Sequence, residues 1–169
     1  MNKHSLIRPG IAALVLAVCL GFTAYSQTQP AGQKGPATTM HATGPFEVKL
    51  APQDDKIDPE LGRMTIDKQF HGDLEATSKG QMLTGGSNPR SSGVYVAVEK
   101  VNGTLKGRKG TFILHHTGIM DHGKPELSIS VVPESGTGEL AGLTGKMNII
   151  IAEGGKHSYD FEYTLPDAK

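Results

Sequence analysis

The sequence predicts an all-β fold, a single antiparallel β-barrel of about seven or eight strands, and three observations lead to this prediction. Apolar and polar residues alternate along most of the chain after residue 46, as they do in half-buried antiparallel strands. Glycine is abundant, with 22 of 169 residues, and lacks the every-third-residue period of collagen. A glycine-containing motif recurs along the chain, which favours similar hairpins folded into a closed sheet without exposed edges.

Charge and cysteine content exclude several classes of protein. The chain has 17 basic and 17 acidic residues, so its net charge gives no indication of a nucleic-acid partner or an anionic membrane. The single cysteine excludes an intrachain disulfide scaffold. We therefore expect a domain that is held together by its apolar core.

The N-terminus resembles a secretory signal peptide, and we assign residues 1–26 to it. Lys3 and Arg8 precede an apolar run at residues 11–22, and Ala24 and Ser26 supply the small residues of a cleavage site. The run is short for a membrane span, which takes about 20 residues. An uncleaved anchor and a lipoprotein acylated at Cys19 are the two alternatives. Each of the three readings predicts export, and the cleaved form would reach the periplasm or the extracellular space without stable membrane insertion.

The remaining chain divides into three parts. Residues 27–39 are rich in Gln, Pro, Gly and Thr without apolar periodicity, which is typical of a flexible linker. The barrel is expected over residues 40–165, and residues 166–169 form a tail.

Strands are expected wherever the alternation is clear. The alternating runs are residues 46–50, 64–76, 127–131 and 157–165. Residues 94–101 and 111–114 are apolar on both faces, which predicts more central strands. No segment shows a helical period with capping residues.

The recurring motif reads G-x-L-x-G-x-x-G-x followed by a large apolar residue. It occurs at residues 103–112 (GTLKGRKGTF) and 138–147 (GELAGLTGKM), with a looser copy that begins at residues 72–76 (GDLEA). Each copy is expected to join a short strand, a glycine-dependent turn and the start of the next strand.

Seven segments of the chain resemble the DUF3224 family of bacterial proteins, and together they extend over about residues 40–165. The matching segments are residues 44–49, 70–76, 95–99, 103–114, 116–118, 132–145 and 157–165. The resemblance implies a compact barrel of the allene oxide cyclase and dirigent kind. It implies no activity, and no catalytic residue of those two groups can be matched to a position in this chain. It also leaves room for a homo-oligomer of unspecified size.

Two polar residues are candidates for chemistry in such a barrel. Glu99 follows the phase of Tyr95 and Val101. It is either a buried or rim carboxylate of the cavity with a raised pKa, or it faces solvent or pairs with Arg108 or Lys100. His116 follows the phase of the apolar residues before it. It is either a core or rim histidine hydrogen-bonded to a backbone carbonyl, or an acid/base group or ligand contact in the cavity.

Candidate ligand-binding residues lie on three of the expected strands. In the last strand the aromatics Tyr159, Phe161 and Tyr163 share one face, where they either fill the core or line a pocket. The other candidates are Tyr95, Ala97 and Phe112. No histidine or acidic cluster has the spacing of a metal site, so we expect neither a metal nor a cofactor.

The most favoured function is the binding of a small, mostly apolar molecule in the barrel interior. The first alternative is an isomerase- or cyclase-like enzyme that uses Glu99 or His116. The second is an interaction module that acts through an exposed apolar patch.

Overall fold

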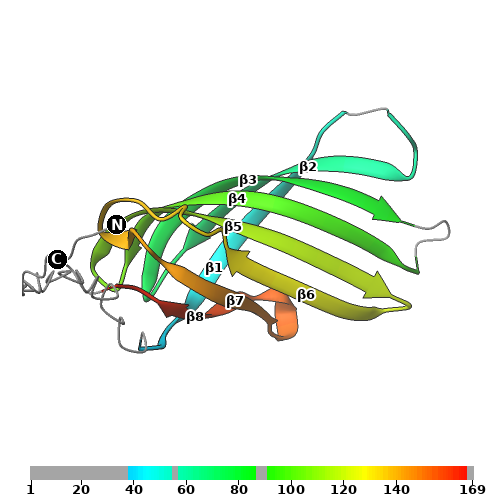
Figure 1. The fold of residues 1–169 in the computed structure, drawn as a ribbon. Helices are drawn as coiled ribbons and strands as arrows, with labels where there is room; N and C mark the ends of the chain where they lie inside the picture. Colours follow the sequence, from blue (N-terminus) through cyan, green and yellow to red (C-terminus); the bar gives the residue numbers. More distant parts are fainter. Residues whose placement is uncertain (1–37, 55–56, 87–90, 167–169) are drawn as a thin grey trace, which may run out of the picture. The chain divides into compact units, whose positions relative to one another are not determined.

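The computed structural model describes residues 38–54, 57–86 and 91–166 and shows one antiparallel sheet closed into a barrel (Figure 1). Eight strands pair in sequence order, and the last pairs with the first. The strands are β1 (Met40–Pro52), β2 (Leu61–Phe70), β3 (Leu74–Gly86), β4 (Gly93–Leu105), β5 (Arg108–Asp121), β6 (Lys124–Val131), β7 (Thr144–Ile151) and β8 (His157–Thr164). The predicted all-β barrel is confirmed. The predicted signal peptide and most of the predicted linker and tail lie outside the described residues.

Two of the hairpins have turns of two residues. Lys106 and Gly107 join β4 to β5, and His122 and Gly123 join β5 to β6; all four have positive φ. A type I′ turn requires this backbone conformation, and its twist matches that of the flanking strands. The first copy of the recurring motif thus forms a strand, a turn and a strand, as predicted.

The other two copies of the motif differ from the prediction. Residues Gly138–Leu140 form a short 3₁₀ helix, η1, in place of a strand. In the third copy, Gly72 lies in the turn before β3, and Gly80 lies inside that one long strand. The same glycine spacing therefore does not always give a hairpin. Gly80 lies inside a strand, where the lack of a side chain allows close packing against β4, and not in a turn.

The connection between β6 and β7, residues 132–143, closes one end of the barrel. Val132 and Thr137 donate backbone hydrogen bonds of 2.8 Å to β5 beyond the end of β6, so the connection takes the place of a paired strand there. It also buries Leu140 and Leu143 completely. Directly between β6 and β7 the pairing is short, with one registered pair, Ser130 and Lys146.

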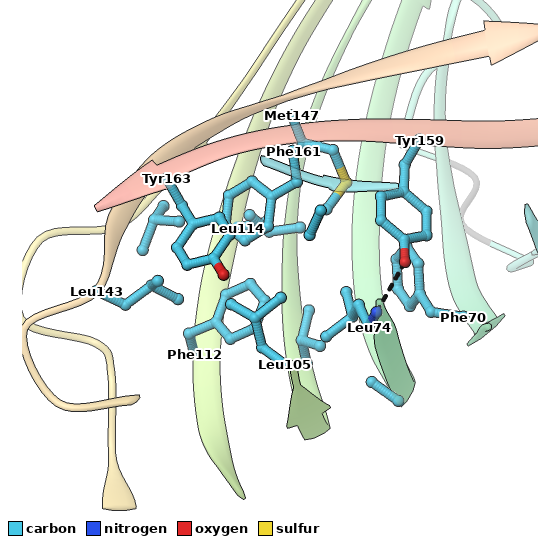
Figure 2. Packing of buried hydrophobic residues seen from close by; sticks show 14 of the residues in the cluster. Phe70, Leu74, Leu105, Phe112, Leu114, Leu143, Met147, Tyr159, Phe161 and Tyr163 are labelled. Atoms are coloured by element: carbon cyan, nitrogen blue, oxygen red, sulfur yellow. Dashed lines mark hydrogen bonds between the residues drawn. The ribbon is translucent and has the colours of Figure 1, made fainter. Parts of the chain in front are cut away.

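The closed half of the barrel is filled with apolar side chains (Figure 2). Phe161 of β8 stacks between Phe112 and Tyr163, with ring centroids 5.9 and 5.2 Å apart. The hydroxyl of Tyr159 accepts a hydrogen bond from the backbone N–H of Leu74 at 2.8 Å and donates one to the carbonyl of His71 at 3.0 Å. The polar atom of this buried ring is therefore satisfied.

The outer face of the sheet carries an apolar strip on neighbouring strands. Val94, Val96 and Val98 on β4 are 48–57% exposed, and Leu83 on β3 and Ile119 on β5 lie beside them. The prediction that residues 94–101 form a more central strand is therefore wrong. In a closed barrel every strand has two neighbours, and the second apolar face of β4 meets solvent. Within the described residues no helix is long and apolar enough to cross a membrane.

Candidate functional site

The open half of the barrel contains a cavity of about 650 Å³. It lies at the end of the barrel where β2, β4 and β6 begin (Figure 1), and Leu61, Gly93 and Pro125 near those strand starts line it. Its wall is mainly apolar and includes Phe46, Val48, Ile66, Met82, Ile129 and Ile149. Around the mouth the apolar side chains of Leu50, Leu61, Met120, Leu127 and Ile151 remain 41–65% exposed.

The period-two pattern of the strands places these side chains inside. On β4, Ala97, Glu99 and Val101 are buried while the residues between them are exposed, so the Tyr95 face is the inner face, which the sequence left open. The ring of Tyr95 lies over Gly118 of β5, and a Cβ at Gly118 would overlap that ring. Glycine at this position thus lets the aromatic ring lie flat against the wall.

A buried polar cluster separates the cavity from the filled half of the barrel. Glu99 has no exposed surface, and its Oε2 accepts a hydrogen bond of 2.7 Å from Nζ of Lys68 on β2. Its Oε1 accepts one of 2.6 Å from the hydroxyl of Ser78 on β3. Nε2 of His116 on β5 lies 3.3 Å from Oε2 of Glu99, outside hydrogen-bonding geometry, and has no hydrogen-bond partner among the described residues.

Close packing of the backbone makes room for this cluster. Gly80 pairs with Glu99 across β3 and β4, and a Cβ on Gly80 would lie 3.1 Å from Cβ of Glu99 and 2.6 Å from the carbonyl oxygen of Val98. The ammonium group of Lys68 lies 5.3 Å from the ring centroid of Phe46 and 5.5 Å from that of Phe70. Both aromatic faces stabilise the buried cation.

The ionisation of Glu99 differs from the sequence prediction. Burial on its own raises the pKa of Glu99, but His116, Lys68 and the Ser78 hydroxyl outweigh it and lower the pKa to about 2. The expected raised pKa is therefore wrong, and so is the alternative in which Glu99 faces solvent beside Arg108 or Lys100. The Arg108 guanidinium instead donates a hydrogen bond to the carbonyl of Pro166 at 3.1 Å.

Lys68 and Ser78 are the residues of the cluster that sequence reasoning missed. Both occupy inward positions of alternating strands, Lys68 between Ile66 and Phe70 and Ser78 after Ala76. The sequence signal that could have found them is a polar residue at a position where the alternation places apolar residues. This signal is strong for a Lys, because Lys is almost never fully buried without a partner.

The structure places four of the eight candidate residues in or beside the open half of the barrel and the other four in the closed half. Glu99 and His116 lie together in the cluster, and Tyr95 lies on the cavity wall. Ala97 is buried against Ile66 and Met82. The remaining four lie in the packed core of the closed half, namely Phe112, Tyr159, Phe161 and Tyr163.

His116 also differs from one of its two expected roles. Its ring is 5% exposed and lines the cavity, but among the described residues neither ring nitrogen bonds a backbone carbonyl. The described part of the chain also has no group of three or more His, Cys, Asp or Glu side chains placed to hold a metal.

Together these features define a class of protein: a small antiparallel barrel that is packed at one end and hollow at the other, with a buried ion pair between the two halves. A family model described as a protein of unknown function (DUF3224) matches residues 42–163. The chain belongs to this family.

A solved structure of the same family supports the assignment. The crystal structure of a DUF3224 protein of unknown function from Shewanella oneidensis MR-1 is 44% identical, with a TM-score of 0.72. The match covers 78% of this chain and 100% of the Shewanella chain. A comparison with curated proteins found no match.

Proposed function

We propose that the protein binds a small, mostly apolar molecule in the open half of its barrel. The observation that carries this proposal is the cavity of about 650 Å³, whose wall is mainly apolar although the other half of the same barrel is fully packed. Ligand sites in small barrels are of this size and lining. The exposed apolar side chains at the mouth can contact an apolar molecule as it enters the cavity.

The hydrophobic contribution to the free energy of binding can be estimated from the apolar surface that the ligand buries. A ligand that loses about 200 Å² of apolar surface to this wall gains roughly 5 kcal/mol of transfer free energy. Part of that gain offsets the loss of translational and rotational freedom. The expected affinity is therefore modest for a small ligand and increases with its apolar area.

A tryptophan placed in the cavity tests the proposal. Val48 lines the cavity and is half-buried, so Val48→Trp fills the space and should weaken binding of the neutral apolar dye Nile red at least about tenfold. Val96→Trp makes the same change on the outer face of β4 and should retain wild-type binding. Nile red fluorescence titrations measure both, with circular dichroism to confirm folding. Equal binding by the two variants would show that the dye does not use the cavity.

The catalytic alternative receives less support from the geometry. Both oxygens of Glu99 are occupied by donors, the pKa of Glu99 is lowered to about 2, and Glu99 does not line the cavity. A general base needs a reachable proton and a pKa near the working pH. Of the two catalytic candidates, Glu99 and His116, only His116 remains available as a general acid or base in the cavity.

The apolar strip on the outer face supports a second candidate function, association with another copy of this chain. Five neighbouring apolar side chains of β3, β4 and β5 face solvent, and the interaction alternative requires such a patch. Sedimentation of the purified protein over a concentration range checks this. A monomer at all concentrations would exclude the strip as a stable interface between copies.

We also propose that the protein is exported. Support comes from the basic residues, the apolar run and the cleavage-site residues of the first 26 positions.

A further inference from the structure

The inner end of the cavity presents one cation to an incoming ligand. Lys68 and His116 line the cavity, whereas Glu99 and Ser78 lie behind them and do not. The Lys68 ammonium has three N–H donors, and within the described residues one of them is used, by Glu99. A molecule that reaches this end therefore meets a charged donor with unused hydrogen-bonding capacity.

The charge of that cation is already balanced. Glu99 is 2.7 Å from Lys68, carries no exposed surface and stays ionised, so the pair has no net charge. A ligand carboxylate bound to Lys68 would place a second negative charge close to Glu99 in an apolar interior. Like charges at such short range, and an uncompensated buried ion, are both strongly unfavourable.

Among the described residues that line the cavity, Lys68 is the one Lys or Arg side chain. Besides Lys68, the charged lining residues are Glu60 and Glu126, which are both acidic and lie near the mouth. The titratable side chains on the remaining wall are Tyr95, His116 and His157. An uncharged oxygen avoids the electrostatic penalty and still accepts a charge-assisted hydrogen bond from the ammonium.

We propose that the cavity selects uncharged molecules with one hydrogen-bond acceptor, a carbonyl or hydroxyl oxygen bound by Lys68, and that Glu99 excludes the corresponding carboxylates. This inference rests on the proposed ligand-binding function and specifies its ligand class. The apolar body of the ligand contacts Val48, Ile129 and Ile149, and its oxygen accepts a hydrogen bond from the ammonium.

Three ligands of nearly equal shape test the selection at pH 8. Benzylacetone, hydrocinnamate and isopentylbenzene share a phenylethyl body and end in an acetyl, a carboxylate and an isopropyl group. Displacement of Nile red measures their affinities. In the wild-type protein benzylacetone should bind more tightly than hydrocinnamate; the reverse order would overturn the exclusion of carboxylates.

Rejection of an anion is expected of any apolar cavity, so variants provide the decisive comparison. Glu99→Gln leaves the Lys68 charge unbalanced and should raise the ratio of hydrocinnamate to benzylacetone affinity about tenfold. The double variant Lys68→Met with Glu99→Gln removes both charges together, which perturbs the fold less than removing one. It should lower the ratio of benzylacetone to isopentylbenzene affinity by about tenfold, because the ketone loses its charged donor.

A matched control exists on the outer surface of the same strands. Lys79 of β3 and Asp67 of β2 form an exposed ion pair, so the double variant Lys79→Met with Asp67→Asn should leave both ratios unchanged. Unchanged ratios in the Lys68 and Glu99 variants would overturn the inference. Should Glu99→Gln fail to fold, an unchanged ratio of benzylacetone to isopentylbenzene affinity in the double variant would still overturn the inference. Absence of binding by Nile red and all three ligands would instead contradict the proposed function itself.

Discussion

Glu99 shows how partners on other strands reverse the behaviour expected of a buried residue. The alternation places Glu99 on the same face of β4 as Tyr95, and the structure shows that this face is buried, where burial alone would raise the pKa of Glu99. His116 on β5, Lys68 on β2 and Ser78 on β3 meet its carboxylate and together lower the pKa instead, although Lys68 is 31 positions away in sequence. The periodicity of a strand reports which face a side chain occupies. It does not report which side chains of other strands meet it, and that contact decides the chemistry.

The lowered pKa makes the stability of the fold depend on pH. The pKa of Glu99 is about 2 in the folded protein and near its ordinary 4.5 when unfolded, so ionised Glu99 stabilises the fold at neutral pH. This contribution, roughly 3 kcal/mol, is complete above about pH 5 and is lost as the pH falls from there toward 2. Urea unfolding at pH 7 and pH 3 measures it.

Two variants separate Glu99 from the other carboxylates. Glu99→Gln should show a smaller loss of stability between pH 7 and pH 3 than the wild type, whereas Glu162→Gln, on the exposed face of β8, should keep the wild-type loss. An unchanged loss in Glu99→Gln would place the acid sensitivity elsewhere.

At the scale of elements, the connection between β6 and β7 completes the closed end of the barrel. Its glycine-rich motif predicts a strand and a turn, but residues 138–140 form a 3₁₀ helix. The glycine spacing could not reveal this, because the deciding interactions are with β5. Thr137 and Ser135 accept backbone hydrogen bonds there through their hydroxyls at 3.1 Å, and a Glu139 carboxylate oxygen accepts one from Lys109 at 2.8 Å.

Leu140 at the end of η1 should therefore be one of the most sensitive core positions. Leu140→Ala removes a completely buried side chain and should lower the free energy of unfolding by about 3 kcal/mol, because packed surroundings collapse only partly around the hole. Leu127→Ala, at the exposed mouth, is the matched control and should change it by less than about 1 kcal/mol. Urea denaturation measures the free energy of unfolding of both variants. Equal effects would contradict the role of η1 in packing the closed end of the barrel.

For the whole molecule, the fold was more predictable than the site. Alternation and glycine content were sufficient for a closed antiparallel barrel, because both are local consequences of strands with one face inside. They could not show that one half is packed and the other hollow. Phe112, Tyr159, Phe161 and Tyr163 lie in the correct phase for a pocket, yet the barrel places them in its filled half. The position of a side chain along the barrel axis depends on the register between strands. The alternation within one strand gives no information about that register.

Export is the prediction that belongs to the whole chain. The protein recovered from its own envelope or culture medium should begin at Gln27, because cleavage after Ser26 follows the small residues at positions 24 and 26. It would then lack Cys19 and contain no thiol. N-terminal sequencing with intact-mass measurement checks this, and an N-terminus at Met1 or at an acylated Cys19 would identify one of the two alternatives.

The short pairing between β6 and β7 has a consequence for how the barrel fluctuates. Seven of the eight strand interfaces are held by long ladders, and the eighth by one registered pair, Ser130 and Lys146. Opening at the eighth interface breaks few backbone hydrogen bonds, so it requires less free energy than unfolding of the whole domain. Amide protons beside this interface are therefore expected to exchange with deuterated solvent ahead of those in β3 and β4. The barrel wall is therefore expected to open first along this interface, at a place set by the small overlap of β6 with β7 rather than by the length of either strand.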